Sequence, residues 1–298
     1  MVTIFLLLLV FVSFELYSFI YEKNVIQKRV STMDNFLFSV EENLERQMYI
    51  IGFRIIFLAG NKVTSTGNYI DVDSFFNESF FNGTVNGEEE EILIGVTYDD
   101  LIDSLNEKAS KLNVNITLKD SYIEISQSSP WYINFSLISD FTMSDKADLA
   151  KWEKQQIVSA LIPVENFEDP VYTVNSYAKI SRKITRTPYE GNYVSGSDVS
   201  NLYAHVDGGY YADNENAPSF LNRLEGNLSA DVNGIESFVN IPELSAQGIP
   251  PLTKTTIDYF YFSSDNPTHY AVAGMPSWFR IDEQDNHFEK YGVESLII

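Results

Sequence analysis

Histidines and acidic residues are the side chains of this sequence that could carry catalysis or bind a metal ion. The three histidines, His205, His269 and His287, include no His-x-x-x-His pair, the spacing that places two imidazoles on one helix face for zinc. The sequence has no cysteine, and therefore no thiolate ligand, nucleophilic thiol or disulfide. It also lacks a Gly-x-Ser-x-Gly nucleophile motif and a phosphate-binding glycine loop. We therefore expect neither a cofactor nor an enzymatic activity.

Two acidic stretches carry the oxygen donors that calcium prefers. They are residues 213–216 and 282–286, and neither has the alternating Asp-x-Asp-x-Asp-Gly pattern of a calcium loop. His205 and Asp207 precede two glycines, but two such residues are a common chance occurrence. The sequence therefore predicts no metal site.

Five Asn-x-Ser/Thr sequons are candidate N-glycosylation sites. Their asparagines are Asn77, Asn82, Asn115, Asn134 and Asn227. The first two lie in a segment rich in Asn, Gly, Ser and Phe, residues 61–87, that we expect to be a surface loop. Asn115 and Asn134 lie in expected strands, so their use requires that each side chain faces outward.

The charge of the chain excludes one class of partner. The formal net charge is −22, almost all of it after residue 60, and such a surface repels the phosphates of nucleic acid. Aromatic residues are dense after residue 171, notably at 210–211 and 259–262. Strand packing accounts for them, and a surface that binds carbohydrate or another surface ligand is the alternative.

The chain begins with an apolar run, the first of the elements that position these residues. Residues 2–21 contain one charge, Glu15, and are long enough as a helix to cross a hydrocarbon core of about 30 Å. No small-x-small cleavage site follows, so we expect a retained single-pass anchor. Lys23, Lys28 and Arg29 follow the run, and the positive-inside rule alone would place them in the cytoplasm. Because a large folded domain can translocate regardless of such charges, we expect the C-terminal domain outside the cell.

An apolar stripe continues the run as a helix. Apolar residues recur in steps of three or four from Ile26 to Leu58, which predicts a helix that ends at Gly60. Residues 49–58 are apolar nearly all round, so this end of the helix should be buried in a domain.

This N-terminal pattern resembles the archaeal type IV pilin-like surface proteins. The resemblance covers about the first 60 residues: an apolar helix that opens VTIFLLLL at residues 2–9 and continues into an amphipathic half. It implies a β-rich head, and a homo-oligomer or filament formed through the N-terminal helices. Glu15 is the candidate assembly contact; the alternatives are a position at the membrane interface or a contact with a partner helix.

The sequence after the helix predicts an α+β fold. Thr97 is the expected N-cap of a helix that ends near Asn113. A hairpin is expected at 114–125 with its turn at 119–121, followed by strands at 131–143 and 152–164. These strands would form an antiparallel meander, and its apolar face would cover the buried end of the long helix.

Four regions follow from this reading. They are an anchor (1–22), an amphipathic helix that continues it (23–60), a pilin-like sheet domain (61–170) and a second, mixed and aromatic-rich subdomain (171–298). The last would include a short helix at 217–226 and strands at 234–239 and 256–262.

The leading hypothesis is a cell-surface structural or adhesive protein, anchored in the membrane by its first helix, with an acidic extracellular head. The alternative is a membrane-tethered sensor or partner-binding module that dimerises through residues 24–48 as a coiled coil. An anchored hydrolase is a third hypothesis, which requires two carboxylates that converge in one cleft.

Overall fold

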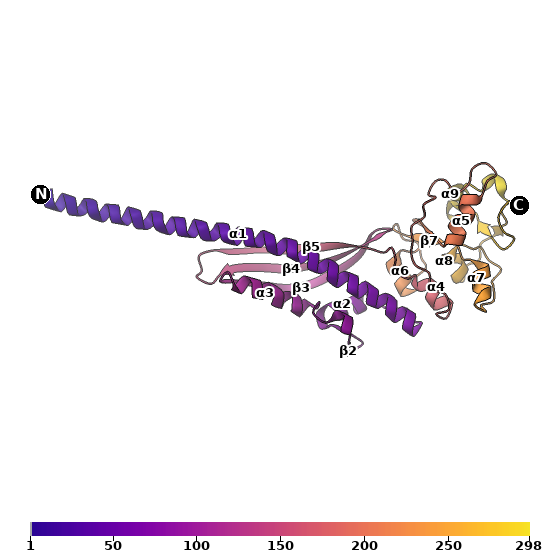
Figure 1. Cartoon of the computed structure of the whole chain (residues 1–298), viewed down its shortest axis with the longest axis horizontal. Coiled ribbons are helices and arrows are strands. Elements are labelled where there is room, and N and C mark those ends of the chain that lie inside the picture. Colours follow the sequence, from indigo (N-terminus) through magenta and orange to yellow (C-terminus); the bar gives the residue numbers. More distant parts are fainter. Residues whose placement is uncertain (1) are drawn as a thin grey trace. The chain divides into compact units, whose positions relative to one another are not determined.

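The chain is an α+β protein, described over residues 2–298 by a computed structural model (Figure 1). One long helix precedes an antiparallel sheet, and short helices and strands make up the C-terminal half. The α-helices are α1 (Val2–Thr66), α2 (Val72–Asn82), α3 (Tyr98–Ser110), α4 (Pro170–Asn175), α5 (Ser200–Gly208), α6 (Phe220–Glu225), α7 (Ile241–Ala246), α8 (Asp258–Phe262) and α9 (His287–Tyr291). The strands are β1 (Thr84–Val85), β2 (Glu88–Glu89), β3 (Val114–Ser129), β4 (Tyr132–Asp145), β5 (Lys151–Pro163), β6 (Tyr211–Asp213), β7 (Ile235–Ser237), β8 (His269–Tyr270) and β9 (Ile281–Asp282).

The chain divides into two compact units. The first contains the chain up to Ile50 together with Gly95–Glu124 and Ser136–Ala160. The second contains Ile51–Ile94, Ile125–Phe135 and Leu161–Ile298. Because α1 and the three long strands contribute residues to both units, neither unit is continuous in sequence. The four regions expected from the sequence stay a prediction.

Helix α1 extends beyond the end that its sequence pattern predicts. It continues through Gly60 and ends at Thr66, where Gly67 adopts a left-handed φ of 66° and its N–H donates to the Val63 carbonyl at 2.8 Å. Gly60 remains helical because a glycine inside a helix costs only about 1 kcal/mol relative to alanine, and burial of Val63 offsets this cost. The expectation that the helix ends at Gly60 was wrong by about two turns.

The sequence predicts a surface loop at residues 61–87, and this prediction is wrong, because the segment forms regular elements. These residues hold the end of α1, then α2, then β1 and the turn that leads to its antiparallel partner β2. Helix α2 begins at the N-cap Asp71, whose side chain accepts a hydrogen bond from the Ser74 amide at 2.7 Å. Phe76 and Phe80, one turn apart, are fully buried and lie against Phe135 of β4. Burial of these rings outweighs the poor helix propensity of the Asn and Ser residues.

Strands β3, β4 and β5 form a three-stranded sheet in sequence order. The amide of Asp145 donates to Ala150 and that of Val164 donates to Trp131, so β4 and β5 pair antiparallel in one register. The hairpin expected at 114–125 was wrong, since β3 runs unbroken through this segment. Asp120 does adopt a left-handed φ of 49°, but the strand continues past it to Ser129.

Each unit has its own apolar core. In the first, Met33, Val40 and Leu44 of α1 are buried together with residues of α3 and the sheet. In the second, Gly52 of α1 lies so close to the sheet that a Cβ there would stand 2.3 Å from the Ile162 side chain and 2.9 Å from that of Phe135. A glycine is required at this close approach.

The C-terminal half carries a separate cluster of buried aromatic and aliphatic side chains, including Phe238, Tyr259 and Tyr291. The helix expected at 217–226 is present as α6, and the strand expected at 234–239 is present as β7. The strand expected at 256–262 is instead helix α8. Since Tyr259, Phe260 and Tyr261 are all buried, their pattern has no period that would distinguish helix from strand.

Candidate functional site

The N-terminal third of α1 presents an unbroken apolar surface. Every large apolar side chain from Ile4 to Tyr21 is exposed, and none of the most apolar 18-residue window, with mean hydropathy 2.2, is buried. In the part of the chain that the structure describes, α1 is the one helix that is long and apolar enough to cross a membrane. This segment is a candidate membrane span.

Glu15 lies on the exposed surface of this segment, and it has no ion pair among residues 2–298. Its role as an assembly contact stays a prediction.

Arg29 joins α1 to the end of the sheet. Its Nε donates to Asp145 Oδ1 at 2.7 Å, and its Nη2 donates to the Leu112 carbonyl at 2.6 Å and to the Asn113 carbonyl at 3.1 Å. Burial would raise the pKa of the Asp145 carboxyl, but the hydrogen bonds from Arg29 and from the amides of the turn outweigh burial and lower it. In the sequence, Arg29 is recognisable only as a topology signal, because no local pattern pairs it with a residue 116 positions away.

The five sequon asparagines occupy different environments. Asn77 and Asn82 lie exposed on α2, Asn115 lies exposed on β3, and Asn227 lies exposed after α6. Asn134 is half-buried on the central strand β4. Side-chain access is therefore present at four of the five candidates, and glycosylation itself stays a prediction.

Arg223 is the centre of one fully buried polar cluster. Its Nη1 lies 2.7 Å from Asp169 Oδ2 and 3.1 Å from Asp258 Oδ2, and Tyr211 OH donates to Asp169 at 2.8 Å. Burial alone would lower the pKa of the Arg223 guanidinium, but the two carboxylates outweigh burial and raise it. The guanidinium is permanently charged and enclosed, so this cluster is suited to holding α4, α6 and α8 together.

His287 lies in a second buried cluster. Its Nδ1 is 2.9 Å from Asp282 Oδ1 and its Nε2 is 3.1 Å from Glu236 Oε2. Burial would lower the pKa of His287, but Glu236 and Asp282 outweigh burial and raise it to about 10, so the imidazole is a cation at neutral pH. Glu236 also accepts hydrogen bonds from Lys290 and from Tyr291 OH, at 2.5 and 2.8 Å.

Glu236 of this second cluster is bonded to partners within the protein through both carboxylate oxygens. Burial would raise the pKa of Glu236, but Lys290 and His287 lower it well below its usual range. A carboxylate in this state is a poor general base. Among residues 2–298 no group of three or more His, Asp or Glu side chains could hold a metal ion.

His205 and the aromatic pairs that suggested a binding face are part of the core. His205 is fully buried, and its Nδ1 lies 2.9 Å from Thr187 Oγ1; burial lowers its pKa to about 3. Tyr211, Tyr259 and Tyr261 are also buried. These buried rings therefore do not support the binding of a carbohydrate or surface ligand, which stays a prediction.

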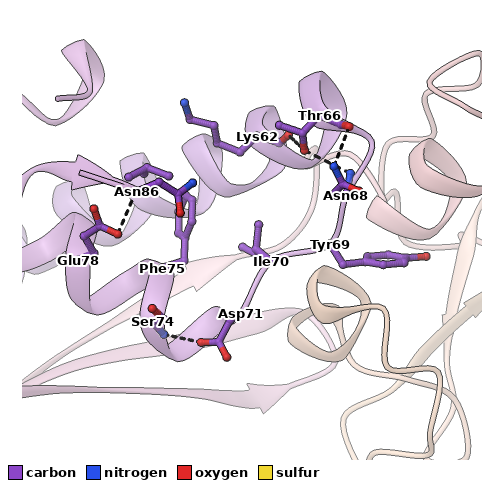
Figure 2. Close-up of a pocket in the computed structure, with 11 residues that line it drawn as sticks. Lys62, Thr66, Asn68, Tyr69, Ile70, Asp71, Ser74, Phe75, Glu78 and Asn86 are labelled. Carbon is purple, nitrogen blue, oxygen red and sulfur yellow. Dashed lines mark hydrogen bonds between the residues drawn. The ribbon is translucent and has the colours of Figure 1, made fainter. Parts of the chain in front are cut away.

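A pocket of about 320 Å³ opens between the end of α1 and the start of α2 (Figure 2). Its acidic side chains have structural partners: Asp71 caps α2, and Glu78 accepts hydrogen bonds from Thr84 and from the amides of Asn86 and Gly87. These hydrogen bonds lower the pKa of Glu78, and the bond from the Gly87 amide has the largest effect. The lining contains no histidine, so the pocket lacks the usual general base.

No protein-family model, no curated protein and no solved structure matches this chain. The resemblance to pilin-like proteins rests on the N-terminal residues alone.

Proposed function

We propose that this chain is a cell-surface structural or adhesive protein, anchored by residues 2–21 and carrying an acidic head outside the cell. The observation that supports the proposal is the change of environment along α1. The helix is apolar and exposed from Ile4 to Tyr21, and the same helix supplies buried core residues from Met33 onward. An anchor with these properties leads directly into the folded head.

The pilin-like character of this architecture is part of the proposal. It is supported by one uninterrupted helix that combines an apolar surface with a half that lies against an antiparallel sheet. Assembly through the apolar third of α1 would give a homo-oligomer or a filament.

Two observations favour this proposal over the alternatives. A coiled coil through residues 24–48 would need Met33, Val40 and Leu44 at its seam, and all three are buried within the chain's own fold. Arg29 is bonded to the head, so its charge has a structural use that does not depend on topology.

The absence of cysteine allows a direct test of topology. Val232→Cys places a single thiol on the head at a position that is 75% exposed, and Leu8→Cys is the matched control in the proposed span. A membrane-impermeant maleimide should label Val232→Cys on intact cells and leave Leu8→Cys unlabelled. Labelling of Val232→Cys only after lysis would place the head in the cytoplasm and refute the surface role.

Electron microscopy of cells labelled at the same cysteine tests assembly. Labelled filaments would support a pilin-like role, and a diffuse surface label would support an anchored monomer. The absence of external label would contradict both.

A further inference from the structure

Basic residues gather where Arg29 joins α1 to the head. Three segments meet there: residues 22–30 of α1, 110–113 after α3, and 145–151 at the β4–β5 turn. Together they contain six of the chain's 20 Lys and Arg residues and three of its 42 Asp and Glu residues. The remainder holds 14 basic and 39 acidic residues, so this small region reverses the sign of an otherwise strongly acidic chain.

The lysines of this region are all exposed, and we call them together the basic rim. It consists of Lys23, Lys28, Lys111, Lys146 and Lys151. Lys111 and Lys151 form exposed ion pairs with Glu107 and Glu153. Lys23, Lys28 and Lys146 have no ion pair with an acidic residue in the described part of the chain, so their charges remain available to an outside partner.

The basic rim lies close to the proposed membrane surface. Arg29 follows the last residue of the apolar run, Tyr21, by eight positions, which a helix covers in about 12 Å. The polar headgroups occupy about 5–7 Å beyond the hydrocarbon core, and screening at physiological salt extends over about 8 Å. The β4–β5 turn is the end of the sheet nearest the N-terminal half of α1 (Figure 1). Lysines at this level are within electrostatic reach of lipid headgroups.

Apolar side chains accompany these charges. Leu149, at the β4–β5 turn between Lys146 and Lys151, is 43% exposed. Val25 and Ile26 of α1 are also exposed and extend the apolar surface of the span toward the rim. Basic residues beside exposed apolar ones are the composition of surfaces that lie on anionic membranes.

We propose that the basic rim docks on anionic lipid headgroups, with Leu149 at the membrane interface, and so holds the near end of the head against the bilayer. The inference rests on the proposed function in one respect, namely that residues 2–21 span the membrane. Each lysine near an anionic surface should change the ratio of docked to undocked heads about fivefold, the equivalent of about 1 kcal/mol.

The test uses the full chain with one cysteine, Leu149→Cys, carrying a fluorophore, in vesicles that contain a headgroup-attached quencher. Ile157→Cys is the matched control, because Ile157 is 61% exposed on β5, the strand that follows the turn, six residues and about 20 Å beyond Lys151. Vesicles of phosphatidylcholine are compared with vesicles that also contain phosphatidylglycerol. Quenching at position 149 should increase in the anionic vesicles and decrease again in high salt, while quenching at position 157 stays low in both.

A charge reversal tests the residues themselves. Lys146→Glu in the Leu149→Cys background should reduce the docked fraction by at least about fivefold. Lys119→Glu is the control, since Lys119 is exposed on β3 outside the rim. Equal quenching in neutral and anionic vesicles, or equal effects of the two reversals, would overturn the docking inference while leaving the anchor intact. Failure of the chain to float with either kind of vesicle would overturn the membrane anchor and the inference with it.

Discussion

Arg223 ranks first by volume among the fully buried side chains, and its charge is balanced entirely within the protein. Its removal would leave Asp169 and Asp258 as neighbouring carboxylates without a cation, in a space that excludes water. Removal of one partner from a buried ion pair typically costs about 3–5 kcal/mol. Arg223→Met, which keeps much of the side-chain volume, should therefore lower the free energy of unfolding by this amount in urea titrations.

Lys111→Met is the control for that measurement, because it removes an ion pair with Glu107 in which both side chains are exposed. A change of no more than about 0.5 kcal/mol is expected there. Similar effects of the two substitutions would show that the Arg223 cluster is not a stabilising centre.

His287 should make stability depend on pH in the alkaline range. Its pKa is about 10 in the folded protein and about 6.5 in an unfolded chain, so between these values the folded state retains a proton that the unfolded state has lost. The stabilisation is complete below about pH 6.5 and is lost as the pH rises through 10, with a slope of up to about 1.4 kcal/mol per pH unit. Denaturant titrations of the wild type and of His287→Gln between pH 6.5 and 10 measure this slope. The variant should lose it, and an unchanged slope would assign it to other groups.

His205 should have the opposite effect in acid. Its pKa is lowered to about 3, so the unfolded state binds a proton first as the pH falls below about 6.5, and the free energy of unfolding decreases. His205 packs among the rings of Tyr193, Phe238 and Tyr291. His205→Phe keeps an aromatic ring there and should flatten the stability profile between pH 6.5 and 4. A profile as steep as that of the wild type would contradict this assignment.

At the scale of elements, the packing of α1 on the sheet depends on one glycine. An alanine inside a helix usually stabilises it by about 1 kcal/mol relative to glycine. At Gly52 the added Cβ would overlap the side chains of Ile162 and Phe135, and overpacking of this kind costs about 1–3 kcal/mol. Gly52→Ala should therefore lower the melting temperature.

Gly60 is the matched control in the same helix. A Cβ at this position meets no atom within 4 Å, so Gly60→Ala should raise the melting temperature. If both variants were stabilised, α1 would not approach the sheet as closely as the structure shows.

The elements that the sequence predicted well are those with local signals. The stripe from Ile26 to Leu58 predicted α1, and Thr97 with Asp100 forms the capping box that begins α3. The elements it predicted wrongly depend on distant contacts. Helix α2 is stabilised by rings that lie against Phe135, and α8 contains Asp258, which binds Arg223, 35 positions away. Local periodicity carries no information on such partners.

At the scale of the whole molecule, the clusters around Arg223 and His287 were equally inaccessible to sequence reasoning. Their members are Asp169, the N-cap of α4, and residues of β6, α6, β7, α8, β9 and α9, and no spacing rule relates them. The sequence drew attention to residues 282–286 only as oxygen donors that calcium prefers, and it predicted no metal site there. In the structure the Asp282 carboxylate faces the protonated His287, which disfavours a cation at that position.

The division of α1 into an exposed and a buried part predicts how the molecule responds to truncation. Residues 3–21 contribute no side chain to the core, whereas Met33, Val40, Leu44 and Met48 are buried in it. A chain that begins at Glu22 should therefore stay in solution without detergent and keep the circular dichroism and melting temperature of the full-length head.

A chain that begins at Ile51 provides the comparison, because it loses all four of these core side chains. Each large apolar side chain removed from a core costs about 2–5 kcal/mol, so the four together cost about 8–20 kcal/mol, comparable to the about 5–15 kcal/mol that stabilises a typical domain. Because all four belong to the first unit, this shorter chain should lose the cooperative unfolding of that unit. Loss of the cooperative transition in the chain that begins at Glu22 would instead mean that the apolar third of α1 is needed for folding. Cooperative unfolding of the first unit in the chain that begins at Ile51 would mean that this unit does not depend on residues 22–50 of α1, and the anchor would then be a separable segment rather than the first half of a core helix.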